Sequence, residues 1–598
     1  MQTLNDFLLM REDLAFKISK FNGILGRLGL QDRSLTLTSL ENSCHKASFR
    51  VLIAGEFKRG KSCLVNAMLG DSVLPMKVAP CTTTISEVSY GDTPKLIVEA
   101  NDGTHEVSFT DRFQYCTIQG HKTLPAEQKP IHKVKMEYPS SVCSKCVTLI
   151  DSPGLNEDWS RTQTSLREIA QADVLMLVLS CEMALSQSEQ LFIQSHLLPY
   201  KDRLFFLWNR ADAIWDKPSE KEALKQRSDE HLSKYSDQIY FVSAREGLLG
   251  KIQQDDAQWT KSNIPMVLQK MEQFLVQNQT KSKLEGFWQQ SMQMSTYTLF
   301  QLIPRMEHLL QSSEDSVKEY KLATEAVERA ERDRVEQIQS EIAKTTGDLL
   351  TTMEERFIQF IDRIPSKIAT DADNLTFEPR ISRQEREDII IDWFNQWLQQ
   401  ALHLFTQDEL RTTMEASFSD LKIQVDAVRM DHIVAIDEAL DCNADEIQLF
   451  SGRWIEETSL LITTALSLML LKIDRDLIAK NLLKVRALRG WLMGSTLNEG
   501  DRLKLAKQLQ QTLHTEQGRV IAAQKSHMNE TTTHLQQSIE QDLRLTRLDA
   551  MQQIETVLKL HTSGKQDTSL EQQQLQLETL RLSVHTMHSQ LRTMMTNL

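Results

Sequence analysis

Proline is missing from the last part of the chain: Pro379 is the final one, and 219 residues follow it. A proline in a helix interior costs about 3 kcal/mol, so its absence favours long uninterrupted helices. The same region is rich in Gln, Leu, Glu, Lys and Arg, which are good helix formers. Together with the charge-laced pattern from Glu314 to Phe360, this composition predicts that the second half of the chain is mostly helical.

Long apolar runs and paired cysteines are scarce as well. No run reaches the roughly 18 apolar residues that a membrane-spanning helix needs, so no such helix is expected. The first residues, MQTLNDFLLMREDLAFK, carry acidic side chains inside the apolar run, which argues against a signal peptide. Of eight cysteines, only Cys143 and Cys146 form a CxxC pair, so no zinc site is expected. We therefore expect a cytoplasmic protein with reduced thiols, peripheral at most on a membrane.

An excess of basic residues is also lacking. The formal net charge is −14 and the pI is about 5.6, which argues against nucleic acid as a partner and against a protein that acts on ribosomes or RNA. Anionic membranes are not excluded, because a local basic patch acts within a Debye length.

What the first half does contain is a series of short apolar runs separated by helical patterns. Such alternation predicts an α/β domain with a mostly parallel sheet, between about Ser48 and Leu248. Helical sequence precedes it over residues 1–45 and follows it from about Ile264, so the α/β head is inserted into an elongated all-α body. We expect the N-terminal helix to pack with late helices such as residues 569–598. The predicted strands are FRVLIAG, ISEVSYG, KLIVEA, VTLID, DVLMLVLS, RLFFLWN and IYFVSA.

The motif GEFKRGKS, Gly55 to Ser62, follows the first of these strands and precedes a helical pattern. This is the GxxxxGK[ST] phosphate loop in its required context. The N–H groups of the loop and of the first helical turn, including Gly60 and Cys63, would face phosphate oxygens. Lys61 would reach the β- and γ-phosphates, and the Ser62 hydroxyl would bind Mg²⁺.

Three later motifs, each at a strand end, favour GTP over ATP. In VTLIDSPGL, Asp151 can hold Mg²⁺ through water and the Gly154 N–H can sense the γ-phosphate. In LFFLWNRAD, Asn209 and Asp212 are placed to select guanine, since a carboxylate accepts both N–H donors of the guanine edge and adenine offers no such pair. In YFVSAREGL, Ser243 and Ala244 lie where a backbone N–H could meet the guanine oxygen.

A threonine that closes over Mg²⁺ and the γ-phosphate is expected between the phosphate loop and Asp151. The stretch VAPCTTTISEVSYG offers Thr82, Thr83 and Thr84, of which we favour Thr82. The alternative is that the stretch is only a polar turn before a strand.

The residues GEFKRGKSCLVNAMLG, PCTTT, DSPGL and NRAD resemble those of the bacterial dynamin-like proteins over about residues 50–250. The resemblance implies a large GTPase using GTP/GDP and Mg²⁺, with heads that pair across their nucleotide faces and so stimulate hydrolysis. It also implies membrane association or remodelling, and allows for a related dynamin-like partner. The implied domains are an N-terminal neck helix (1–47), a GTPase head (48–262), a helical neck and trunk (263–455), a membrane-interacting tip (456–496) and returning helices (497–598).

Three positions within the motifs depart from other GTPases. Leu155 lies near the place where small GTPases keep a water-orienting glutamine, so other groups must position the water. Lys58, or failing that Arg59, is a candidate for neutralising charge in the transition state, the alternative being that both are solvated surface charges. Arg210 replaces a lysine that commonly packs on the base, and its planar guanidinium can stack equally well.

The candidate membrane segment is residues 460–492. It joins LLITTALSLMLL, too short to span a bilayer, to a stretch with six basic and two acidic residues whose apolar side chains share one helical face. Such a segment suits an anionic membrane surface. A buried helical hairpin with a solvated basic edge is the alternative.

Two other functions fit parts of the sequence. A coiled-coil ATPase of the chromosome-organising kind would leave NRAD unexplained. A helical scaffold that binds GTP with little turnover and works through protein partners is the alternative that the sequence leaves open.

Overall fold

The structure, a computed structural model, describes residues 3–28, 30–56, 58–76, 85–100, 103–117, 131–152, 168–169, 171–183, 185–193, 197–371, 397–398, 401–402, 404–442, 499–562 and 566–596. These residues form two compact units, which are described separately. The head comprises Met1–Asp13 and Cys44–Glu285, and the helical unit comprises Leu14–Ser43 and Gly286–Leu598. The candidate membrane segment, residues 460–492, lies outside the described residues.

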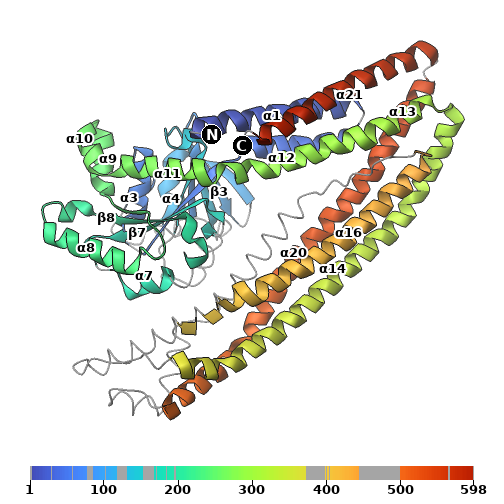
Figure 1. Ribbon diagram of the computed structural model, residues 1–598. Coiled ribbons are helices and arrows are strands. Elements are labelled where there is room, and N and C mark those ends of the chain that lie inside the picture. The colour runs from blue at the N-terminus through green and yellow to red at the C-terminus, as the bar shows by residue number, and fades with distance from the viewer. Residues whose placement is uncertain are drawn as a thin grey trace. The chain divides into compact units, whose positions relative to one another are not determined.

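In the described residues, the head is built on a nine-stranded sheet with the order β4-β3-β5-β2-β6-β1-β7-β8-β9. Strands β3, β7 and β8 are labelled in Figure 1. Five of its eight strand pairings are parallel, and the antiparallel ones are β2 with β6, β3 with β4 and β3 with β5. The predicted mostly parallel sheet is therefore confirmed. The strands are β1 Phe49–Ala54, β2 Ile85–Tyr90, β3 Lys95–Ala100, β4 Gly103–Val107, β5 Ile131–Tyr138, β6 Val147–Asp151, β7 Val174–Ser180, β8 Leu204–Asn209 and β9 Ile239–Phe241.

Strand β1 runs through the middle of the sheet, and its side chains alternate between two hydrophobic cores. Val51 and Ile53 belong to one core, while Leu52 and Ala54 belong to the other, and all four are fully buried. A strand buried on both faces explains the continuous apolar run in the sequence. The described head helices are α3 Lys61–Leu69, α4 Arg112–Cys116, α7 Gln187–Phe192, α8 Pro218–His231, α9 Ala244–Gln253, α10 Asp256–Lys261 and α11 Ile264–Asn278.

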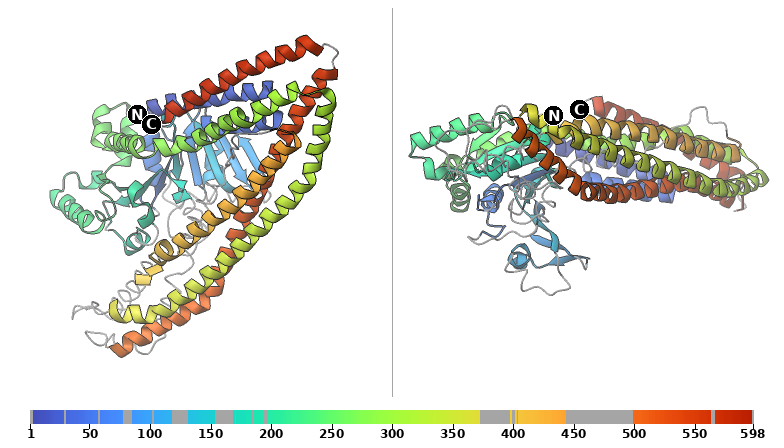
Figure 2. Two further views of the ribbon diagram at one scale, coloured as in Figure 1. Left: turned by 45° about the vertical axis from the view of Figure 1, so that its right-hand side comes forward. Right: turned by 90° about the horizontal axis from the view of Figure 1, so that it is seen from below.

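The helical unit confirms the prediction of long helices in the second half of the chain. Three of its long helices, α14, α16 and α20, lie side by side and share one hydrophobic core (Figures 1 and 2). Helices α1, α2 and α12 contribute residues to both units. These helices and the others of the unit are α1 Leu4–Arg27, α2 Gln31–His45, α12 Thr280–Tyr297, α13 Ile303–Gln311, α14 Glu314–Asp371, α16 Arg411–Ala439, α20 Glu499–Thr562 and α21 Gln566–Thr596.

Helix α2 contacts the late helix α20, while the predicted packing against residues 569–598 stays a prediction. Arg33 of α2 donates from Nε to Asp549 Oδ2 at 2.8 Å, and both side chains are buried. Within the described part of the chain, no helix combines the length and the apolar character needed to cross a membrane.

Candidate functional site

The phosphate loop, residues 55–62, joins β1 to α3 and needs glycine at two positions. Gly55 has φ +147°, and a Cβ there would lie 2.5 Å from the carbonyl oxygen of Val178. Gly60 has φ +91°, and a Cβ there would lie 2.3 Å from Nδ2 of Asn209. A side chain at either position would push the loop away from β7 or β8. The two glycines therefore let the loop settle on the strand ends, with α3 beginning at Lys61.

Lys61 places its ammonium group on the inside of this loop. Its Nζ donates to the carbonyl oxygen of Gly55 at 2.9 Å and to that of Glu56 at 3.0 Å, and the side chain is buried. The first N–H groups of α3 have no partner inside the helix and favour an anion. The loop thus presents a buried cation and backbone donors together, as a phosphate site requires.

Ser62 and Asp151 meet beside Lys61 because β1 and β6 are parallel neighbours whose carboxyl ends share one edge of the sheet. The Ser62 hydroxyl donates to Asp151 Oδ2 at 2.6 Å. Burial raises the pKa of Asp151 to about 6, while Lys61 and the Ser62 hydrogen bond oppose the shift. Oδ1 of Asp151 is buried and has no hydrogen-bond partner among the described residues. A hydroxyl and a carboxylate with an unused oxygen are donors that Mg²⁺ prefers.

Asn209 ties the phosphate loop to the segment after β9. Its Nδ2 donates to the carbonyl oxygen of Arg59 at 2.9 Å, and its Oδ1 accepts the backbone N–H of Ala244 at 3.0 Å. The same oxygen accepts the N–H of Arg210 at 2.8 Å. The side chain is buried and uses both ends of its amide. Three motifs that the sequence places far apart therefore meet at one residue.

Asp212 and Ser243 face each other next to Asn209. The Ser243 hydroxyl donates to Asp212 Oδ1 at 2.6 Å and also accepts the N–H of Glu246, so Ser243 caps α9. This hydrogen bond orients the carboxylate that the sequence analysis assigns to guanine. The Ala244 N–H, one candidate for the guanine oxygen, is occupied by Asn209 instead.

Arg210 has polar partners on two sides of the site. Its guanidinium is ion-paired with Glu182, and its NH2 donates to the carbonyl oxygen of Lys58 at 2.8 Å. Lys58 takes a left-handed backbone conformation with φ +65° and has an exposed side chain. Cys63 lies close to Arg210 and Asp212, and burial raises the pKa of its thiol to about 11, so it stays neutral. Cys63 is therefore a packing residue of the site's wall.

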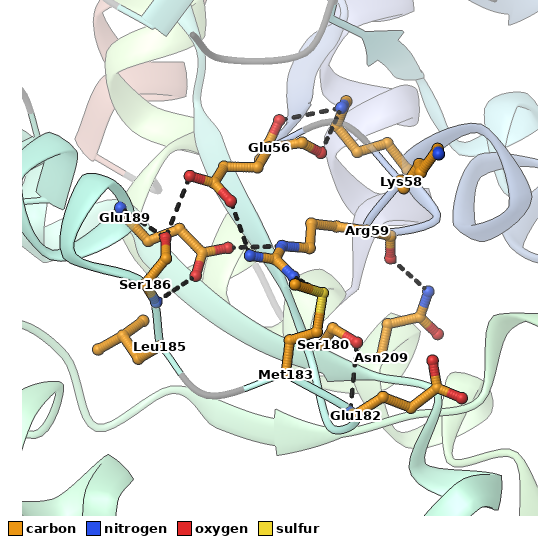
Figure 3. A network of polar contacts seen from close by, with 12 residues as sticks. Glu56, Lys58, Arg59, Ser180, Glu182, Met183, Leu185, Ser186, Glu189 and Asn209 are labelled. Atoms are coloured by element: carbon orange, nitrogen blue, oxygen red, sulfur yellow. Dashed lines mark hydrogen bonds and ion pairs between the residues drawn. The ribbon is translucent and has the colours of Figure 1, made fainter. Parts of the chain in front are cut away.

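Arg59 shows an arrangement that sequence analysis missed (Figure 3). Its side chain is 3% exposed and forms ion pairs with Glu189 at 2.8 Å and with Glu56 at 2.7 Å. It is not a solvated surface charge. Two signals are visible in the sequence: Glu56 and Arg59 are three residues apart, and SQSE at residues 186–189 is the signature of a capping box. Neither signal says that the two pairs meet.

Thr82 and Gly154, the predicted γ-phosphate contacts, lie outside the described residues. The structure brings together the other predicted site residues at one edge of the sheet. In the described part of the chain, Cys143 and Cys146 are buried free thiols, and no group of three or more His, Cys, Asp or Glu residues is arranged to hold a metal ion.

Comparison with known proteins agrees with this geometry. Residues 51–211 match the profile of the Dynamin family. A bacterial dynamin-like protein of Nostoc punctiforme is 23% identical over 428 residues, which span 64% of this chain and 59% of the relative. Mitofusin FZO1 of Saccharomyces cerevisiae is 29% identical over 35% of this chain and 27% of its own length.

The chain thus covers less than two thirds of these curated relatives. Among solved structures, an oligomerised bacterial dynamin pair described as sensing and tethering membranes aligns with 98% of this chain and 83% of its own. The TM-score is 0.36 and the sequence identity is 14%.

Proposed function

Because residues 51–211 form a dynamin-family domain, we propose that this chain binds guanine nucleotide and hydrolyses GTP to GDP and phosphate. The observation that carries the proposal is the position of Asn209, which connects the phosphate loop to the segment that holds Asp212. A phosphate site and a guanine-selective carboxylate in one rigid arrangement suit a guanine nucleotide better than an adenine nucleotide.

Each predicted residue has a role in the proposal. Lys61 binds the β- and γ-phosphates, and Asp212 accepts the two N–H donors of guanine. Ser62 and Asp151 would hold Mg²⁺, which supplies charge neutralisation to the phosphates when bound. Thr82 and Gly154 would close on the γ-phosphate.

We also propose that hydrolysis is stimulated when two heads pair across their nucleotide faces. Of the two loop cations considered, Arg59 is buried in ion pairs whereas Lys58 has an exposed side chain. This difference supports Lys58 as the cation that meets transition-state charge when a second head covers the loop.

The proposed site of action is a membrane surface. Support comes from the dynamin-family domain and from the basic, apolar character of residues 460–492. A related dynamin-like partner is part of the proposal, while nucleic acid is not, because of the acidic net charge.

The direct test is a calorimetric titration of the chain with GTP, GDP and ATP, beside Asp212→Asn. Guanine nucleotides should bind and ATP should not. The variant should bind GTP about a hundredfold more weakly and should gain affinity for xanthosine triphosphate, because an amide matches the carbonyl that xanthine carries in place of the guanine amino group. Equal binding of GTP and ATP by the unaltered chain would contradict the proposal.

A further inference from the structure

A cluster of polar and charged side chains connects the phosphate loop to the segment after β7. The proposed reaction does not use these side chains. We define the cluster as Glu56, Arg59, Ser186 and Glu189 and call it the loop brace (Figure 3). Arg59 donates from Nε to Glu189 at 2.8 Å, from NH2 to Glu56 at 2.7 Å and from NH1 to the sulfur of Met183 at 2.9 Å. All three guanidinium nitrogens are thus engaged.

The two carboxylates are themselves held in place by Ser186. The Ser186 hydroxyl donates to Glu56 at 3.1 Å, and the Ser186 N–H donates to Glu189 Oε2 at 2.9 Å. The N–H of Glu189 donates to the Ser186 hydroxyl at 3.1 Å, and this hydrogen bond completes the capping box of α7. The loop brace therefore fastens the phosphate loop to the segment after β7, residues 180–189.

Two of the loop-brace side chains are buried, whereas Glu56 and Ser186 are partly exposed. Arg59 and Glu189 are each 3% exposed. If Arg59 swung out toward a nucleotide, Glu189 would be left as a buried charge without its main partner, which is strongly unfavourable. This geometry argues against Arg59 as a mobile cation that reaches the phosphates.

The backbone of Arg59 nevertheless belongs to the nucleotide site. Its carbonyl oxygen accepts Nδ2 of Asn209 at 2.9 Å. Its two neighbours, Lys58 and Gly60, both have positive φ, at +65° and +91°. Glycine adopts a positive φ readily, but a left-handed lysine is conformationally costly and persists when its surroundings fix it. The ion pairs of the Arg59 side chain therefore fix the backbone between Lys58 and Gly60.

We propose that Arg59 is a positioning residue: its ion pairs with Glu189 and Glu56 hold the phosphate loop in the shape that binds nucleotide and presents the Arg59 carbonyl to Asn209. The proposal rests on the proposed function, since it concerns the same nucleotide. The loop supports the phosphates shared by GDP and GTP. Loss of the loop brace therefore lowers the affinity for GDP and for GTP by a similar factor. Loss of a transition-state cation would instead lower kcat and leave the affinity for GDP unchanged.

The matched control is a second charged cluster in the same sheet. Arg50, near the beginning of β1, pairs with Glu87 at 2.7 Å and with Glu168, and Lys133 contacts both carboxylates at 3.0 Å. The phosphate loop follows the other end of β1. Arg50→Gln should lower the stability of the head and leave nucleotide affinity unchanged.

The experiment measures GDP and GTP affinity by calorimetry and thermal stability by circular dichroism for Arg59→Gln, Glu189→Gln, the double variant and Arg50→Gln. We expect Arg59→Gln to weaken GDP and GTP equally, by about tenfold or more. Glu189→Gln should weaken both nucleotides to a smaller extent, because Arg59 still pairs with Glu56. In the double variant, the fold-loss of affinity should be smaller than the product of the two single fold-losses. Arg59→Lys should restore part of the affinity.

Three outcomes would overturn the proposal. One is a normal GDP affinity in Arg59→Gln with reduced turnover, which would make Arg59 catalytic. Another is a loss of stability without loss of affinity, as expected for Arg50→Gln. The third is additive losses in the double variant. If Arg59→Gln does not fold, Glu189→Gln and Arg59→Lys give the same comparison. If the unaltered chain binds neither GDP nor GTP, the proposed function fails instead, and the two failures are distinguishable.

Discussion

Lys58 and Arg59 are neighbours in the phosphate loop, yet their side chains lie in different environments. Arg59 is buried and ion-paired with Glu189 and Glu56, whereas Lys58 has a left-handed backbone and an exposed side chain. The sequence alone gave no means of separating the two cations, because burial depends on residues 180–189. The structure separates them by burial, and this difference is why we propose Lys58, and not Arg59, as the cation for the transition state.

Lys58→Ala should therefore lower stimulated GTP turnover and leave GDP affinity unchanged. We expect kcat to fall by at least about tenfold at high protein concentration, since cations placed at transferring phosphoryl groups contribute that much or more. Lys58→Arg, measured in parallel, should retain most of the turnover. Full turnover in Lys58→Ala would remove Lys58 from the mechanism.

His432 of α16 is a buried histidine in the helical unit. Its Nε2 lies 3.1 Å from the carbonyl oxygen of Leu543 and 3.8 Å from Glu331, and Arg334 and Arg547 also act on it electrostatically. Since a carbonyl only accepts, Nε2 carries the proton in this contact. Burial, helped by the two arginines and opposed by the Leu543 hydrogen bond and by Asp542, lowers the pKa of His432 to about 4.

Acid should destabilise the helical unit through His432. The unfolded chain, with an ordinary histidine pKa, binds a proton between about pH 6.5 and 4 that the folded chain does not bind, so stability is lost as pH falls through this window. The loss approaches about 3 kcal/mol at the acidic end. Urea unfolding at pH 5 and pH 7.5 should show a smaller difference for His432→Gln than for the unaltered chain. An equal difference would contradict the assignment.

At the scale of elements, all seven strands predicted from apolar runs are present, and β4 and β5 were not predicted. β5, IHKVKMEY, alternates apolar side chains with lysines and a glutamate instead of forming a continuous run. That alternation is the sign of a strand with one buried face, and Val134 and Met136 are indeed buried. A search for alternation as well as for runs would have found β5. β4 is an exposed edge strand with little apolar content to reveal it.

The candidate site was predictable where chemistry is local to a motif. The loop glycines, Lys61, Ser62 and Asp151 follow from spacing and strand ends. The loop brace was not predictable, because Arg59 and Glu189 are 130 residues apart in sequence and meet only when β1 and β7 pair. The position of Arg210 was not predictable either, since its partners Glu182 and the Lys58 carbonyl come from two other loops.

Helices α2, α12 and α20 are joined by a buried polar cluster. Asp549 accepts from Arg33 at 2.8 Å and from the Tyr297 hydroxyl at 3.3 Å, and none of the three side chains is more than 1% exposed. Arg33 also donates to the Thr546 hydroxyl at 3.2 Å. Such a network gives the helices one register, because any shift would leave a buried charge unpaired.

Asp549→Ala should destabilise the helical unit by about 3 kcal/mol, because Arg33 loses its nearest carboxylate inside the core. The measurement is urea unfolding followed by circular dichroism. Lys318→Ala is the control, since the pair of Lys318 with Glu314 lies on the surface of α14 and should leave the midpoint unchanged. Equal midpoints for Asp549→Ala and the unaltered chain would show that the cluster is not stabilising.

At the scale of the whole molecule, the head has a hydrophobic core on each face of its sheet, and the helical unit has a separate core. Separate cores in the two units allow more than one unfolding step, so stability changes in the head and in the helical unit should be measured with separate probes. The proposed functions divide in a similar way: nucleotide chemistry and pairing belong to the head, and membrane contact belongs to helical sequence, residues 460–492.

The central claim is that this chain is a GTPase whose hydrolysis depends on assembly. The most direct test is GTP turnover per molecule across a protein concentration series, with and without anionic liposomes, beside Lys61→Ala. Turnover should rise with concentration and rise further with liposomes, while Lys61→Ala stays at background. A rise with concentration alone would support head pairing and contradict membrane binding by this chain. A flat, near-zero rate despite tight GTP binding would contradict the claim and favour a GTP-binding scaffold.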